Sequence, residues 1–158
     1  MKGQPLKKQE PLQISTKNGL DSYFVTICCH EARPVFLDKE VADSVQRELE
    51  FRNNVDTAAI YCYTLMPNHL HMIVSLQKAY EGNLPKWVSA FKSFTSKTVK
   101  KEFGIERLWQ TNFYEHVVRN DESLDEIIDY VLNNPVRKGI VGRWEEYPYS
   151  RVFRELIR

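Results

Sequence analysis

The sequence predicts one α+β domain with a ferredoxin-like βαββαβ order: an antiparallel sheet, helices on one face and an added C-terminal helix. Three observations support this. β-prone runs alternate with segments of helical periodicity, a short turn at Pro67-Asn68 joins two of the runs, and a further helical pattern follows the fourth run. At 158 residues the chain has the size of one domain with a sizeable core. We expect a flexible N-terminal arm over residues 1–21 and a single domain over 22–158.

The first half of the chain supplies three of the predicted strands. Tyr23–Cys29 is rich in aromatic and β-branched residues and predicts the first strand. Asp38 then opens a helix with valine, alanine and leucine on one face, which fades near Asn53. Two more strands are predicted over residues 57–65 and 69–76, and the short turn between them indicates an antiparallel hairpin.

The second half of the chain supplies two helices and a fourth strand. Pro85 stands where the first turn of a helix favours proline, and that helix is predicted to run to about Phe103. The fourth strand fits residues 112–118. A last helix is expected to begin at Ser123, which has capping-box spacing. It should end at the two asparagines before Pro135, because proline disfavours helical geometry in the preceding residue.

The composition is that of an ordinary globular protein. The formal charge is only +1, so any contact with a nucleic acid would use a local patch. The three cysteines form no C-x-x-C, which argues against both a disulfide framework and a cysteine zinc site and favours core thiols in a reducing cytosol. No apolar segment approaches the length of a membrane span, and no signal-peptide core is present. We expect a cytoplasmic protein.

Two histidines lie two residues apart in the third predicted strand. Alternate residues of a strand point to the same face, so His69 and His71 share one side of the sheet. Two neighbouring imidazoles on a rigid strand can hold a metal ion. Such a pair also arises by chance, so by itself it does not establish a metal site.

The last predicted helix presents a phenol and an amide together. Tyr130 and Asn134 are four residues apart and are therefore neighbours on the helix surface. Two imidazoles and an amide oxygen can hold a divalent ion beside a phosphate, and a tyrosine hydroxyl can act as a nucleophile. This combination suggests phosphodiester cleavage. An amphipathic tyrosine and an asparagine near a helix end also have purely structural explanations.

The helix predicted to begin at Pro85 carries two rows of polar residues that include several lysines. The stretch from Lys86 to Arg119 has seven basic residues against three acidic ones. Such rows are typical of a solvated helix face, or of a surface that contacts a nucleic-acid backbone. His116 could contact DNA, act as a further metal ligand, or be a structural residue of its strand. Arg119 could contact a phosphate or cap the nearby chain reversal. The candidate DNA contacts are Lys92, Lys97, Lys100, Lys101, His116 and Arg119.

Four blocks of the sequence resemble those of the HUH single-tyrosine transposases. Residues 67–71, Pro-Asn-His-Leu-His, resemble the motif of histidine, hydrophobic residue and histidine that gives the family its name. Residues 109–110, 114–119 and 129–136 look like three further blocks in the family's order. The blocks most resemble the REP-associated branch, and the likeness extends over residues 23–150.

The resemblance implies an enzyme that binds single-stranded DNA next to a hairpin. By that likeness His69, His71 and Asn134 hold Mg²⁺ or Mn²⁺. Tyr130 attacks the scissile phosphate, giving a 5′-phosphotyrosine link and a free 3′-hydroxyl, and reversal by another 3′-hydroxyl rejoins strands. The implied partners are single-stranded or hairpin DNA, with no membrane, and the location is nucleoid-associated. Relatives include both monomers and homodimers, so the sequence leaves open whether the tyrosine acts in cis or in trans.

Three functions stay open on the sequence alone. The first is a DNA strand transferase, the second a domesticated hairpin-binding module with little transfer activity, and the third a metal-dependent hydrolase in which Tyr130 is structural. Tyr114 is another possible nucleophile, although its place beside Phe113 on a strand favours packing. The sequence identifies neither the DNA target nor the base that removes the tyrosine proton.

Overall fold

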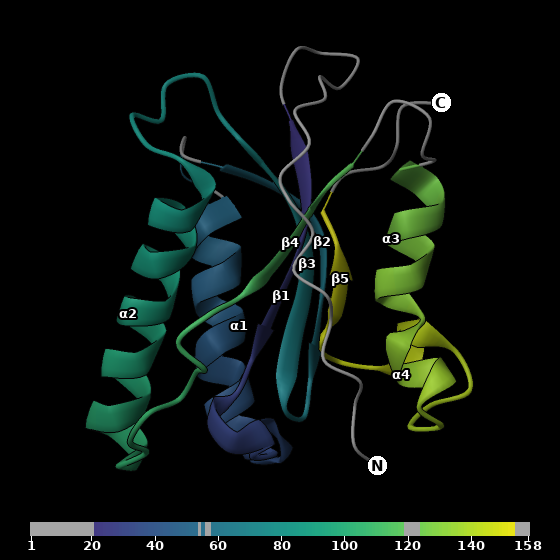
Figure 1. Ribbon diagram of the computed structural model, residues 1–158. Helices are drawn as coiled ribbons and strands as arrows, with labels where there is room; N and C mark the ends of the chain where they lie inside the picture. Colours follow the sequence, from purple (N-terminus) through teal and green to yellow (C-terminus); the bar gives the residue numbers. More distant parts are fainter. Residues whose placement is uncertain (1–20, 54, 56–57, 119–123, 154–158) are drawn as a thin grey trace.

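The chain forms one five-stranded sheet with helices on both sides (Figure 1). The computed structural model describes residues 21–53, 55, 58–118 and 124–153. Three short 3-10 turns, at His30–Ala32, Val35–Leu37 and Trp144–Glu146, interrupt the loops. The regular elements are β1 (Ser22–Cys28), α1 (Lys39–Asn53), β2 (Ala58–Met66), β3 (His69–Leu76), α2 (Leu84–Phe103), β4 (Tyr114–Val117), α3 (Leu124–Leu132), α4 (Asn134–Arg137) and β5 (Ser150–Val152).

The first four strands and two helices follow the order predicted from the sequence. The sheet order is β4-β1-β3-β2-β5, and every pairing is antiparallel. The predicted hairpin is confirmed, since Met66 pairs with His69 across the turn. The fifth strand was not predicted. It comprises three residues that pair with β2 at the sheet edge, a length too short to show alternation.

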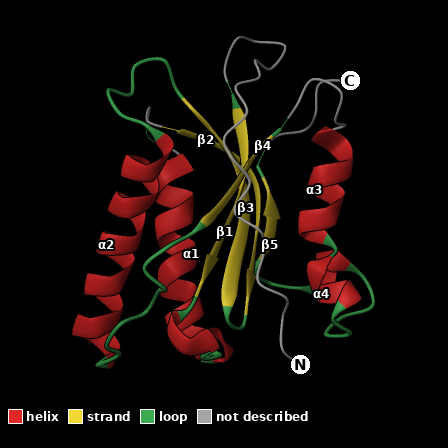
Figure 2. Cartoon of the chain, viewed as in Figure 1, coloured by secondary structure: helices red, strands yellow, loops and turns green. Residues whose placement is uncertain are grey.

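The alternation of side chains along the strands separates two apolar layers. Helices α1 and α2 cover one face of the sheet, and α3 lies on the other (Figures 1 and 2). The larger layer, under α1 and α2, includes Val25, Ile27, Leu70, Met72, Val74, Trp87 and Phe91. The smaller layer, under α3, is formed by Cys62, Ile73, Ile128, Val131 and Leu132. Because His69 and His71 alternate with the larger layer, they point to the α3 side.

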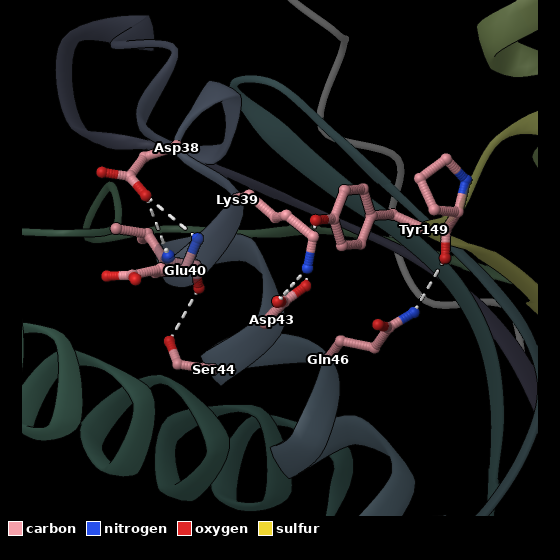
Figure 3. A network of polar contacts seen from close by, with 9 residues as sticks. Asp38, Lys39, Glu40, Asp43, Ser44, Gln46 and Tyr149 are labelled. Carbon is pink, nitrogen blue, oxygen red and sulfur yellow. Dashed lines mark hydrogen bonds and ion pairs between the residues drawn. The ribbon is translucent and has the colours of Figure 1, made fainter.

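Polar contacts fix α1 to the segment that leads into β5 (Figure 3). Asp38 caps the helix, because its Oδ1 accepts a backbone N–H of the first turn at 3.0 Å. The Tyr149 hydroxyl donates to Asp43 at 3.0 Å, and the Gln46 amide donates to the carbonyl of Pro148 at 3.0 Å. These bonds hold the strand that extends the sheet beyond the predicted plan.

The last predicted helix is α3, but Asn134 lies outside it, in a further short helix, which corrects one expectation. Helix α3 ends at Leu132, and α4 begins at Asn134, after a break at Asn133. Pro135 has no N–H to donate to the carbonyl four residues earlier, so the first helix cannot continue through it. Tyr130 and Asn134 therefore do not share one continuous helix edge. Tyr130 is 53% exposed, whereas Asn134 is buried at 4%.

Several other predictions can be compared with the described residues. Cys28, Cys29 and Cys62 are free thiols, as expected. Within the described ranges, no helix is long and apolar enough to cross a membrane. The N-terminal arm up to residue 20, the helix start at Ser123 and the candidate contact Arg119 lie outside the described residues.

Candidate active site

The two histidines of β3 meet edge to face on the α3 side of the sheet. Their ring centroids are 4.5 Å apart at an interplanar angle of 73°, and the two Nε2 atoms are 3.1 Å apart. His71 is buried, and His69 is half-buried. The prediction that His69 and His71 share a face is confirmed.

The other ring nitrogen of each histidine has its own partner. Nδ1 of His71 lies 2.7 Å from the Thr26 hydroxyl on β1. Nδ1 of His69 lies 2.7 Å from Oδ1 of Asn68, in the turn that precedes β3. The amide oxygen only accepts hydrogen bonds, so Nδ1 of His69 carries a proton and its Nε2 keeps a lone pair. Partners of this kind orient metal-ligating histidines and fix their tautomer.

Both imidazoles are held in the neutral form. Burial, together with a smaller effect of the charge of Lys138, lowers the pKa of His69 to about 4. Burial also lowers the pKa of His71 to about 3, with additional effects from His69, Arg137 and Lys138. A neutral imidazole is the form that binds a metal ion, so the pair is ready for coordination at neutral pH.

Asn134 completes the cluster from α4. Its Nδ2 lies 3.4 Å from Nε2 of His69, and its side chain is buried. A rotation of the amide by 180° places the oxygen where the nitrogen stands, so Asn134 can present a carbonyl oxygen to an ion at the same position. Three side chains from two elements thus converge on one point.

The donor set suits a divalent cation with nitrogen and oxygen ligands. Adjacent ligands of an octahedral ion at about 2.1 Å are separated by about 3.0 Å. The Nε2 atoms of His69 and His71, at 3.1 Å, already have this spacing. Across the described residues, no group of three or more His, Cys, Asp or Glu side chains is placed to hold a metal ion. A site here therefore depends on the amide of Asn134.

Phe24 connects the histidine pair to the candidate nucleophile. Its ring stacks on His71, with centroids 5.4 Å apart at 27°. It also meets the Tyr130 ring edge-on, with centroids 6.1 Å apart at 83°. Tyr130 therefore projects from α3 beside the metal-competent cluster of its own chain, separated from His71 by one aromatic ring.

Arg137 also contacts Tyr130, through both the ring and the backbone. Its guanidinium carbon lies 4.0 Å from the centroid of the Tyr130 ring, and its Nη2 donates to the Tyr130 carbonyl at 2.6 Å. That carbonyl belongs to the last turn of α3, whose carbonyls have no partner further along the same helix. Arg137 thus joins the helix of the candidate nucleophile to the helix that bears Asn134.

The lysines predicted to contact DNA lie on the opposite layer of the protein. They belong to α2, which packs against the sheet face away from the histidines (Figure 1). Lys92 also has a structural role, because its ammonium donates hydrogen bonds to the backbone carbonyls of Gln110 and Thr111. Lys100 pairs with Glu106 at 3.5 Å. Lys97 and Lys101 are exposed.

Two residues of β4 do share the face of the histidines. His116 pairs with Phe24, and Tyr114 pairs with Thr26, in the antiparallel register of β1 and β4. Residues directly opposite in such a register point to the same side of the sheet. The structure therefore places the predicted DNA contact His116, and the alternative nucleophile Tyr114, on the sheet surface next to the cluster.

Sequence reasoning missed four residues of this arrangement: Phe24, Thr26, Asn68 in its orienting role, and Arg137. The alternation of β1 placed Phe24 and Thr26 on one face, but nothing local indicated that β1 lies beside β3. The sequence shows that Asn68 directly precedes His69, but it does not show that its side chain bonds to the His69 ring. Arg137 lies seven residues after Tyr130, in a helix that the sequence did not predict.

Comparison with known proteins identifies relatives of this chain. Residues 20–134 match the family described as IS200-like transposases. A REP-associated tyrosine transposase of Escherichia coli K12 is 29% identical over 99 residues, which cover 63% of this chain and 57% of that protein. The chain thus matches little more than half of that relative's length. A Haemophilus influenzae protein provisionally given the same name is 27% identical over 152 residues, covering 89% of this chain and 84% of that protein.

Solved structures show the same fold. A REP-associated tyrosine transposase solved with a REP hairpin aligns with a TM-score of 0.67 at 22% identity, covering 90% of this chain and 81% of that one. A provisionally named transposase of Deinococcus radiodurans R1 aligns with a TM-score of 0.51 at 15% identity, covering 81% of this chain and 97% of that one. Because the family match covers well over half of its residues, this chain belongs to the IS200-like transposase family.

Proposed function

We propose that this chain is a metal-dependent transesterase that cleaves single-stranded DNA next to a hairpin and rejoins strands. One observation carries the proposal: two neutral imidazoles and a buried amide converge within one chain, and Phe24 connects them to an exposed tyrosine. Family membership and the blocks around these residues agree with it. The nucleophile is Tyr130, and the metal ligands are His69, His71 and Asn134.

The reaction is a transfer of one phosphodiester bond. The Tyr130 phenol oxygen attacks the scissile phosphorus, the bond from phosphorus to the 3′-oxygen breaks, the phenol loses its proton, and the 3′-oxygen gains one. The product is a 5′-phosphotyrosine link and a free 3′-hydroxyl. A 3′-hydroxyl that attacks the link reverses these changes and rejoins DNA. No external energy source is needed, because one phosphodiester replaces another.

The two histidines and Asn134 would hold Mg²⁺ or Mn²⁺. When bound, this ion would stabilise the negative charge that develops on the scissile phosphate. The protein's own contribution is orientation. Thr26 and Asn68 direct the Nε2 atoms of the histidines toward one point. The low pKa values of His69 and His71, caused first by burial, keep those atoms available at neutral pH.

The proposed DNA partner occupies the α3 side of the sheet. The half of that surface over β1 and β4 carries Phe24, Tyr114 and His116, whereas α3 packs chiefly over β2 and β3. Aromatic side chains at such a surface can stack on the bases of a single strand. Lys97 and Lys101 remain predicted contacts with DNA phosphates. Because they lie on α2, they would bind a part of the DNA that extends around to the face of the protein away from the histidines.

The arrangement favours catalysis by a monomer with its own tyrosine. Phe24 contacts both His71 and Tyr130 of the same chain, which supports attack by the chain's own tyrosine. We infer a cytoplasmic, nucleoid-associated protein from the same DNA partner.

The test is covalent capture of DNA. The protein is incubated with Mn²⁺ and end-labelled hairpin oligonucleotides copied from inverted repeats that flank its gene, each with its single-stranded flanks. An SDS-resistant adduct is expected from the wild-type protein and from Tyr114→Phe, but not from Tyr130→Phe. Chelation of the metal should abolish the adduct and leave hairpin binding intact.

Other outcomes would support other functions. An adduct that persists in Tyr130→Phe contradicts the assignment of the nucleophile. Cleavage without any adduct would indicate a hydrolase that uses water. Binding without cleavage would indicate a domesticated hairpin-binding module.

A further inference from the structure

The break between α3 and α4 leaves the Tyr130 carbonyl without the backbone partner that a continuous helix would supply, whereas the preceding carbonyl, of Asp129, still accepts from the Asn133 N–H at 2.9 Å. Helix α3 ends at Leu132, and Pro135, near the start of α4, has no N–H to donate. The Arg137 side chain supplies a replacement hydrogen bond, because its Nη2 donates to the Tyr130 carbonyl at 2.6 Å. The same side chain lies over the Tyr130 ring, with its guanidinium carbon 4.0 Å from the centroid. One arginine therefore holds both the backbone and the ring of one tyrosine.

This double contact also links two parts of the candidate site. Arg137 and Asn134 belong to the same short helix, three residues apart, so they lie on neighbouring positions of its surface. Asn134 is buried against His69, while Tyr130 is half-exposed on the preceding helix. Without the arginine, the Tyr130 ring would keep only its edge contact with Phe24 among the described ring contacts.

We propose that Arg137 is a positioning residue for the nucleophile. It fixes the rotamer of Tyr130 relative to the cluster of His69, His71 and Asn134, and its positive charge on the ring face favours the negative charge that grows on the phenol oxygen during attack. The inference rests on the proposed transesterase function and adds a residue that the sequence blocks did not assign. Its effect is expected on the attack step rather than on DNA binding.

Lys138 provides a matched control for the charge of Arg137. It is the next residue along the chain and is also exposed, so its charge lies in the same region. Its backbone N–H continues α4 by donating to the Asn134 carbonyl at 3.0 Å. Arg137→Gln and Lys138→Gln therefore remove one positive charge each from the same region. Only the first removes the recorded contacts with Tyr130.

The first measurement is the single-turnover rate of adduct formation with the hairpin oligonucleotides and Mn²⁺. Arg137→Gln should lower the rate at saturating DNA by roughly tenfold to a hundredfold, the size of effect that a small misplacement of a reacting group produces. The DNA concentration for half-maximal rate should change less than threefold. Arg137→Lys should fall between Gln and wild type, because it keeps the cation but lacks the planar guanidinium. Lys138→Gln should lower the rate much less than Arg137→Gln does, because it removes a nearby charge but no contact with Tyr130.

The second measurement tests the contact without any reaction. Full-length protein is labelled with 3-fluorotyrosine, and the ¹⁹F resonance of Tyr130 is assigned as the signal lost in Tyr130→Phe. Arg137→Gln should shift and broaden this resonance, because the ring loses the cation that restrains it. Lys138→Gln should leave it in place. Mn²⁺ affinity and the thermal midpoint of each variant show whether the metal site and the fold are retained.

The outcomes separate this inference from the proposed function. If wild-type protein forms no adduct, the transesterase function fails, and the inference falls with it. If wild-type protein forms the adduct and Arg137→Gln does so at the same rate as Lys138→Gln, the function stands and the positioning role is overturned. An unshifted Tyr130 resonance in Arg137→Gln also overturns it. If Arg137→Gln does not fold, the milder Arg137→Lys decides by the same two measurements.

Discussion

The hydroxyl of Thr26 lies 2.7 Å from Nδ1 of His71. The two residues are directly opposite on β1 and β3, so the bond is a cross-strand contact set by the register of the sheet. On its other side His71 pairs with Thr64 of β2, whose hydroxyl is 2.8 Å from that of Ser150 instead. Two buried threonines thus flank one histidine, and only one of them bonds to its ring.

Thr26→Val should weaken metal binding without unfolding the protein. Valine keeps the shape of threonine but removes the hydroxyl, so the His71 ring loses its fixed orientation. Loss of such a partner typically lowers metal affinity about tenfold to a hundredfold. Mn²⁺ binding measured by calorimetry or electron paramagnetic resonance checks this. Thr64→Val is the matched control, and an equal loss of affinity in both variants would show that the effect is general to the strand.

Asn68→Ala should likewise weaken Mn²⁺ binding, by about tenfold. The Asn68 oxygen accepts from Nδ1 of His69 at 2.7 Å and so leaves Nε2 available for the metal ion. Asn68→Asp keeps an acceptor at this position and should retain most of the affinity. The same titration with both variants is the measurement. Weak binding in Asn68→Asp together with normal binding in Asn68→Ala would contradict the orienting role.

Lys92 should prove to be a structural residue rather than a DNA contact. Its ammonium bonds to the carbonyls of Gln110 and Thr111, and burial lowers its pKa. Lys92→Gln should reduce the free energy of unfolding by about 1 kcal/mol, because charge-assisted bonds to two carbonyls are lost. Denaturant unfolding measures this. Lys97→Gln, at an exposed position of the same helix, should change stability little, and the reverse order would favour the original DNA assignment of Lys92.

Gly104 should be needed for the end of α2. Its φ is +68°, and its N–H closes the helix by donating to the Lys100 carbonyl at 3.0 Å. A Cβ added there meets no atom within 4 Å, so only the backbone conformation opposes a side chain. Gly104→Ala should cost about 1 kcal/mol in unfolding free energy. Gly142→Ala, equally open but without a positive φ, should cost much less; equal costs would argue against backbone strain.

Much of the fold was predictable because it depends on local patterns. The aromatic and β-branched run of β1, the Asp38 cap, the turn at Pro67 and the proline in the first turn of α2 each act within a few residues. Strand β5 was missed because its three residues become a strand only by pairing with β2. The predicted end of the last helix before Pro135 is confirmed to within two residues, but α4 was missed, because the chain resumes a helical turn at once and takes Asn134 into it.

The candidate site divides in the same way. The sequence by itself determined that His69 and His71 share a face, because a strand alternates its side chains wherever it lies. It also supplied Tyr130 and Asn134 as chemically suitable partners. Only the tertiary structure decided which face that was and placed the α2 lysines on the other one. Strand order brought Thr26 and Phe24 to His71, because such contacts join segments far apart in the chain and leave no local signal. The contact of Arg137 with Tyr130, although only seven residues apart, depends on the unpredicted helix α4.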